Sequence, residues 1–90
     1  MNRNFDDPQY KKWRSMVYKR DKFCCQWPGC SKKYGLNAHH IKRWVDCPSL
    51  RFNIDNGITL CKRHHKQISG MEDIYAGSFM RIIASKKNDR

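Results

Sequence analysis

Residues 56–65 read Asn-Gly-Ile-Thr-Leu-Cys-Lys-Arg-His-His, and this stretch decides the fold. Its apolar run, Ile58 to Leu60, predicts a short strand after the Asn56-Gly57 pair. A helix of about two turns is expected from Lys62 to Ser69, because Gly70 is a typical residue just past a helix end. The stretch therefore predicts a strand that runs into a helix, with a cysteine and two adjacent histidines at the junction.

Two more pairs of ligand-type residues precede this stretch. His39 and His40 are adjacent, and Cys25 and Cys30 enclose the turn-forming Pro28-Gly29. Two soft-ligand pairs and two histidine pairs in so short a chain predict two metal ions. One would hold the fold, and the other would do chemistry.

The cysteines predict the first of these metals. Cys61 and His64 are spaced so that the start of a helix presents both on one side. Together with Cys25 and Cys30 they make four nitrogen and sulfur ligands in two pairs, the pattern of a closed structural zinc site. Cys24 competes with Cys25 for the same role on sequence alone. Cys47 has no partner at a suitable spacing and is not expected to be a ligand.

The remaining segments predict a small α+β domain. Asp7-Pro8 is typical of a helix start, and Tyr10, Trp13 and Val17 then recur with helical spacing. Further expectations are a helix over 8–19, a strand over 37–41, an ordered loop over 42–55 pinned by Trp44, Leu50 and Phe52, a short C-terminal helix over 73–84 with Tyr75, Phe79, Ile82 and Ile83 on one face, and a frayed basic tail over 85–90.

Ninety residues predict one domain, 1–90, and so small a core is marginally stable without a staple. The five cysteines cannot all pair, and the chain starts with a polar run where a secretory leader would have an apolar one. A reducing compartment and metal ligation are therefore expected, rather than disulfides. No apolar run approaches the ~20 residues of a membrane span. The expected location is the cytoplasm.

The charge predicts a polyanionic partner. There are 19 Lys and Arg residues against 8 Asp and Glu, a formal net charge of +11 spread along the chain. Such a field favours binding to phosphate groups, and nucleic acid is the natural candidate. The residues expected on the DNA backbone are Lys11, Lys12, Arg14, Lys42, Arg43, Lys62 and Arg63.

The order of the motifs resembles the HNH endonuclease family with its ββα-metal fold. The resemblance is carried by RDKFCCQWPGC at 20–30, AHHI at 38–41 and NGITLCKRHH at 56–65, and it covers about Arg20 to Lys66, within a motif core of about 20–70. It implies that His39 and His65 bind a catalytic divalent cation and that His40 is the general base. Asn56 would orient His40 or brace the loop. The cation could be Mg²⁺, Mn²⁺, Ni²⁺ or Zn²⁺.

The resemblance implies an enzyme that hydrolyses DNA phosphodiester bonds with weak sequence specificity. As a small free-standing protein of this type, the chain resembles phage-encoded HNH proteins. This resemblance implies a bacterial host cell, a role in DNA packaging or homing, and a phage packaging or targeting protein as partner. The alternative is a zinc-stapled nucleic-acid-binding module without catalysis. The sequence does not choose between a nick and a double-strand break, and it leaves the oligomeric state open.

Overall fold

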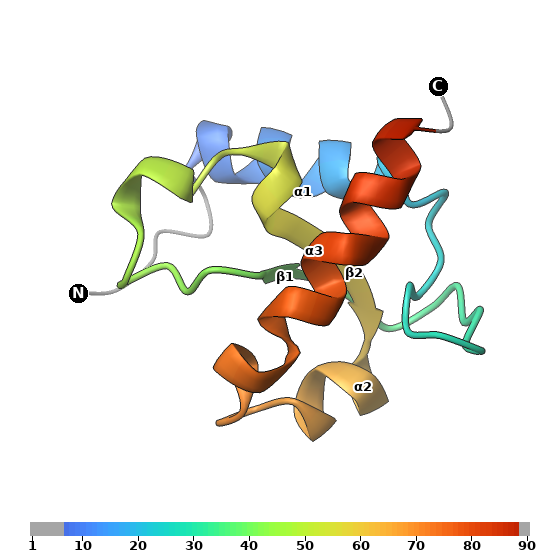
Figure 1. The fold of residues 1–90 in the computed structure, drawn as a ribbon. Helices are drawn as coiled ribbons and strands as arrows, with labels where there is room; N and C mark the ends of the chain where they lie inside the picture. Colours follow the sequence, from blue (N-terminus) through green and yellow to red (C-terminus); the bar gives the residue numbers. More distant parts are fainter. Residues whose placement is uncertain (1–6, 89–90) are drawn as a thin grey trace.

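The computed structural model describes residues 7–88 and has the expected α+β architecture (Figure 1). A two-stranded antiparallel sheet is surrounded by three helices, and the second strand runs directly into a helix. The elements are α1 (Pro8–Arg20), β1 (Leu36–His40), the short 3-10 helices η1 (Pro48–Leu50) and η2 (Ile54–Asn56), β2 (Gly57–Cys61), α2 (Lys62–Gln67) and α3 (Glu72–Asn88). No helix among the described residues is long and apolar enough to cross a membrane.

Helix α1 begins as its sequence predicts. The Asp7 side chain accepts a hydrogen bond from the backbone N–H of Gln9, and Pro8 takes the first helical position. The predicted apolar face, Tyr10, Trp13 and Val17, is buried as a separate cluster. This cluster packs on one face of the sheet.

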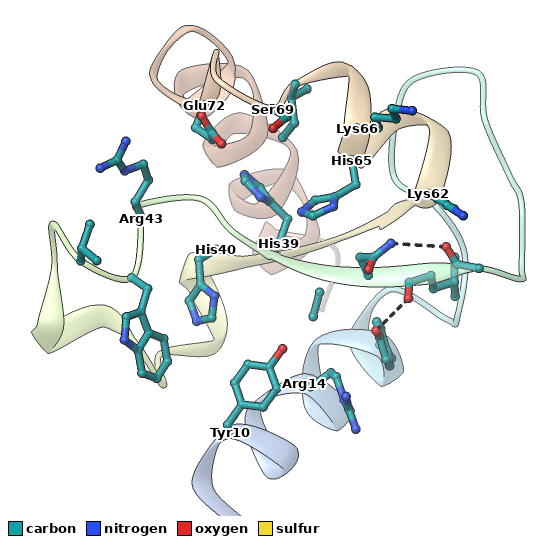
Figure 2. Close-up of a pocket in the computed structure, with 18 residues that line it drawn as sticks. Tyr10, Arg14, His39, His40, Arg43, Lys62, His65, Lys66, Ser69 and Glu72 are labelled. Carbon is teal, nitrogen blue, oxygen red and sulfur yellow. Dashed lines mark hydrogen bonds between the residues drawn. The ribbon is translucent and has the colours of Figure 1, made fainter. Parts of the chain in front are cut away.

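The pairing of β1 with β2 separates the two adjacent histidines. His39 lies opposite Ile58, and His40 lies opposite Gly57. Because side chains alternate between the faces of a strand, the two imidazoles leave β1 in opposite directions. His39 lies on the same face as Ile58, toward α2 and α3, and His40 faces α1 (Figure 2).

The outer edge of β2 is closed by polar groups from the end of α1 and the segment after it. The buried Asp21 carboxylate accepts the backbone N–H of Thr59 at 2.9 Å, and the N–H of Gln26 donates to the Thr59 carbonyl. Arg20 forms an ion pair with Asp21 and also donates to the carbonyls of Ile54 and Gly57. One end of α1 is thereby tied to β2 and to the loop before it.

Helix α3 crosses the sheet face opposite α1 (Figure 1) and completes the larger core. Ala76, Phe79 and Ile83 are buried there against Ile58 and Leu60. The expected C-terminal helix is therefore present, but it is the longest helix among residues 7–88 rather than a short one. It continues to Asn88, so the prediction of a frayed end is wrong for 85–88, and 89–90 lie outside the described residues.

The loop between β1 and η2 is ordered, but not by all the residues expected to pin it. Trp44 packs against the α1 cluster, and Arg51 lies over its ring at 4.6 Å. Leu50 is partly buried, whereas Phe52 is exposed and meets only the edge of Trp44 among the described ring contacts.

Gly57 has a different purpose from the hairpin turn that an Asn-Gly pair usually signals. Its backbone is extended, and a Cβ atom there would lie 2.6 Å from both Trp13 and Val17. The position thus needs glycine because α1 approaches β2 closely, and not because the chain turns there.

Candidate functional site

Four of the predicted ligands form a compact cluster at the junction of β2 and α2. One ligand atom each from Cys25, Cys30, Cys61 and His64 lies within 4.8 Å of every other. The turn through Pro28 and Gly29 brings the first two together, with Gly29 at a φ of 83° that favours glycine. Cys61 precedes α2 and His64 lies on its first turn, so the strand-to-helix junction presents the second pair.

The spacing of this Cys3His cluster suits a tetrahedral metal. Bond lengths of about 2.3 Å for Zn–S and about 2.0–2.1 Å for Zn–N imply a sulfur to nitrogen edge of about 3.6 Å in a tetrahedron. The His64 Nδ1 atom lies 3.6 Å from the Cys25 sulfur and 3.3 Å from the Cys61 sulfur. These two edges are compatible with a tetrahedral metal site formed by the four side chains.

Burial and neighbouring groups shift the pKa values of three of the four cluster residues in different directions. Burial lowers the pKa of His64, and the nearby charges of Arg63 and Lys32 lower it further, so the imidazole is held in its neutral, ligating form. Burial raises the pKa of the Cys25 thiol to about 11. Burial acts the same way on Cys61, but hydrogen bonds, the largest from the His64 backbone, outweigh it and lower the pKa of that thiol. The Cys61 thiol is therefore easier to deprotonate than the Cys25 thiol.

Neighbouring groups support the cluster, and the other cysteines stay outside it. The Trp27 ring stacks on His64 with centroids 4.6 Å apart and planes 1° from parallel, which holds the imidazole in place. Cys25 is buried in the cluster, whereas the Cys24 sulfur hydrogen bonds to the Lys22 carbonyl. The structure thus favours Cys25 over Cys24. Cys47 lies in the loop after β1 and does not belong to the cluster.

A broad cavity beside the sheet collects the remaining histidines. It is lined by His39 and His40 from β1 and by His65 from α2 (Figure 2). The His39 and His65 rings meet edge to face with centroids 5.6 Å apart. His39 is 6% exposed and also meets the ring edge of Phe79, whereas His65 is exposed. The adjacent residues His64 and His65 therefore lie in different places, the first in the Cys3His cluster and the second in the cavity.

His40 reaches the cavity from the other face of β1. Its Nε2 lies 2.9 Å from the Arg51 carbonyl, and because a carbonyl only accepts, the hydrogen is on Nε2. The lone pair of the neutral ring is then on Nδ1. The ring is 5% exposed and is enclosed by aromatic side chains.

Asn56 braces the loop that holds His40. Its side-chain oxygen accepts the Lys42 N–H at 2.7 Å, and its amide donates to the carbonyls of Lys42 and Leu50. The Leu50 carbonyl adjoins Arg51, whose carbonyl receives the His40 hydrogen bond. Asn56 is thus hydrogen bonded to both ends of the loop that carries the Arg51 carbonyl.

The predicted basic residues are divided by the structure. Arg14, Arg43 and Lys62 line the histidine cavity, and Arg63 lines a smaller cavity next to it. Lys11, Lys12 and Lys42 are exposed and are not among the residues that line the larger cavity.

Three further residues of the cavity were missed by the sequence analysis. Lys66 and Ser69 follow His65 on and just after α2, and Glu72 begins α3. A hydrogen bond from its own backbone N–H lowers the pKa of Glu72 against the effect of burial, and the Gly70 backbone, His39 and Arg43 lower it further. Lys66 and Ser69 could have been found from their positions one and four residues after His65. Glu72 lies beyond Gly70, and no motif marks it.

Comparison with known proteins agrees with this arrangement. A family model described as HNH endonuclease matches residues 17–69, more than half of the chain. No curated protein and no solved structure matches the chain significantly. The matched region contains both histidine pairs, Asn56 and the whole Cys3His cluster. On the strength of this match and of the strand, strand and helix that carry the histidines, the chain belongs to the HNH endonuclease family.

Proposed function

We propose that the protein is a metal-dependent endonuclease that hydrolyses DNA phosphodiester bonds with weak sequence specificity. The observation that carries this proposal is the single cavity reached by His39, His40 and His65. Its volume of about 1250 Å³ exceeds the roughly 300–1,000 Å³ of small-molecule pockets, which suits a polymeric substrate.

His39 and His65 are the residues that would hold the catalytic cation. Their centroid separation of 5.6 Å suits two imidazoles that bind one ion at about 2.0–2.1 Å. Glu72 adds a carboxylate to the same cavity, and its low pKa keeps it ionised at neutral pH, which favours a cation nearby. A divalent cation bound there supplies Lewis-acid stabilisation of the phosphate and of the departing oxygen.

His40 is assigned the role of general base. The Arg51 carbonyl holds the hydrogen on Nε2, so the buried Nδ1 carries the lone pair that would take a proton from the attacking water. The water oxygen bonds to phosphorus as the bond to the leaving oxygen breaks. General-base action of this kind is worth about 10²–10⁴-fold in rate.

Arg14, Arg43, Lys62 and Lys66 are assigned to the DNA backbone. They come from α1, the loop after β1, and α2, so positive charge surrounds the three histidines on several sides. Contacts to phosphate give affinity without reading sequence, and they make binding fall steeply with salt. Lys11, Lys12, Lys42 and Arg63 would extend this surface.

The Cys3His cluster would hold a structural zinc, because its ligands and edges match a closed tetrahedral site. The expected setting is the cytoplasm of a bacterial host cell. The proposal extends to a role in phage DNA packaging or homing, in which a partner protein would supply the targeting that so small a domain lacks.

A plasmid assay tests the enzymatic proposal. Supercoiled DNA is incubated with purified protein and with Mg²⁺, Mn²⁺, Ni²⁺ or Zn²⁺ in separate reactions. We expect conversion to the open-circular form with at least one cation. The matched control is His40→Gln, which can still donate to the Arg51 carbonyl and largely fills the space beside Trp13, and it should lose about 10²–10⁴-fold in rate.

The control also separates this enzyme from the alternative. Equal nicking by wild type and His40→Gln would mean a contaminating nuclease or a different base. DNA binding without nicking under any cation would instead support a nucleic-acid-binding module without catalysis.

A further inference from the structure

The His40 ring lies in a stack with an aromatic residue of α1. Trp13 and His40 have ring centroids 3.8 Å apart and planes 11° from parallel. This is the closest ring pair among the described aromatic contacts, and Trp13 is 2% exposed. Tyr10 stacks farther off at 6.4 Å, and Trp44 meets His40 edge-on at 5.4 Å.

The same loop holds both rings of this stack by hydrogen bonds. The Trp13 Nε1–H donates to the Asn53 carbonyl at 2.9 Å, and His40 Nε2 donates to the Arg51 carbonyl at 2.9 Å. The two acceptors are only two residues apart. Each ring is therefore limited in rotation by its own hydrogen bond and in tilt by the face of the other.

Packing beneath the stack leaves little freedom for Trp13 to move. A Cβ atom on Gly57 would lie 2.6 Å from Trp13 Cζ2, so β2 supports the indole directly. Gly57 is also the strand partner of His40. The indole is thus wedged between the backbone opposite His40 and the His40 ring itself.

We propose that Trp13 is a positioning residue for His40, so that the first half of α1, which precedes the region matched by the family model, is part of the catalytic apparatus. This inference rests on the proposed function of His40. Misplacement of a catalytic group by about 1 Å can cost about 10²-fold in rate, so a rigid stack on the base has kinetic value.

Steady-state nicking by a graded series of variants tests the proposal. Trp13→Phe keeps a flat ring but loses the Nε1 donor, and Trp13→Leu removes the ring. We expect kcat to fall about 2–5-fold and about 10–100-fold respectively, with KM for DNA within twofold of wild type. The matched control is Val17→Ala, which weakens the same α1 cluster at a residue that is not among those lining the cavity. Its kcat should stay within twofold of wild type.

A second readout does not depend on activity. In proton–carbon NMR spectra, the His40 ring protons should be shifted upfield by the indole face, less so in Trp13→Phe, and not at all in Trp13→Leu. If Trp13→Leu does not fold, the Phe variant carries the test through its kcat and these shifts.

Two outcomes would overturn the inference. One is that the Trp13 variants have the same kcat as Val17→Ala although the NMR shifts of their His40 ring protons differ from those of wild type. The other is an unshifted His40 ring in wild type. The NMR outcome does not depend on nicking, and the His40→Gln control decides separately whether the nicking measured in the kcat series proceeds through His40.

Discussion

The Cys3His cluster and the histidine cavity differ in how completely the protein surrounds a metal. The cluster gathers four ligand atoms within 4.8 Å, and across residues 7–88 no second group of three or more such atoms meets that limit. The cavity offers two facing imidazoles, one of them exposed. A closed site with four protein ligands suits a structural ion, whereas two ligands leave positions for substrate and water.

One short helix serves both sites, which explains how so small a domain can hold them. His64 and His65 are adjacent on α2, and their side chains diverge by about 100° because a helix has 3.6 residues per turn. His64 stacks on Trp27 in the cluster, and His65 faces His39 in the cavity. Of these two consecutive residues, His64 thus belongs to the cluster expected to stabilise the fold, and His65 to the proposed active site.

Removal of the structural metal should give the largest effect. Structural zinc contributes about 10–16 kcal/mol of apparent binding free energy in small domains, and that free energy is also folding free energy. A strong chelator should therefore abolish the cooperative thermal transition measured by circular dichroism. Cys61→Ser should behave in the same way, and Cys47→Ser is the matched control. If chelator-treated protein kept its cooperative thermal transition, a metal in the Cys3His cluster would not be what stabilises the fold.

Replacing His64 and His65 one at a time by alanine should separate the effect on folding from the effect on nicking. We expect His64→Ala to lose the bound metal and unfold. His65→Ala should remain within about 0.5 kcal/mol of wild type, because the side chain is exposed. Nicking by His65→Ala should nevertheless fall by about 10²-fold or more, since Lewis-acid stabilisation is worth several kcal/mol.

Metal analysis and plasmid nicking on the same two preparations check this prediction. Normal nicking by His65→Ala would remove His65 from the proposed active site. A folded, metal-loaded His64→Ala would show that three ligands suffice.

A change on the α1 side of the sheet should lower the stability of the domain without loss of metal from the Cys3His cluster. Gly57→Ala forces a methyl group against Trp13 and Val17, and overpacking of this kind costs about 1–3 kcal/mol. The midpoint of thermal unfolding should fall by about 4–8 °C for each kcal/mol. Zinc content, measured by elemental analysis, should stay at the wild-type value, and its loss would mean that the two regions are not independent.

The smallest effect should come from a glycine that touches neither site. Gly77 is exposed within α3, and a Cβ atom there would meet nothing within 4 Å. Gly77→Ala should therefore raise the free energy of unfolding by about 0.4–1 kcal/mol through helix propensity and reduced freedom of the unfolded chain. Urea denaturation checks the sign, and a loss of stability would contradict it.

Much of this fold could be predicted because its helix start, helical spacing and ligand spacing each lie within a short stretch of sequence. The Asp7-Pro8 start and the spacing of Tyr10, Trp13 and Val17 identified α1, and the Cys and His spacing identified the cluster. Strand ends differed from expectation by one residue, since β1 covers Leu36–His40 rather than 37–41. Hydrogen bonding across the pair, rather than composition, decides where such a strand stops.

The features that could not be predicted all depend on contacts between distant parts of the chain. Trp13 meets His40 only because α1 packs across β2, and Glu72 enters the cavity only because α3 begins beside α2. The need for glycine at position 57 could not be predicted either, because it comes from the close approach of α1, which leaves no mark on neighbouring residues. Nothing in a one-dimensional pattern records such packing.

The polar closure of β2 has a consequence for solution behaviour. A strand with a bare outer edge can recruit a strand from another molecule and so start aggregation. Here the Thr59 amide and carbonyl are already bonded to Asp21 and Gln26, so the centre of that edge offers no free main-chain groups to a second copy. Asp21, held by its ion pair with Arg20, therefore also blocks the pairing of another molecule's strand with the outer edge of β2.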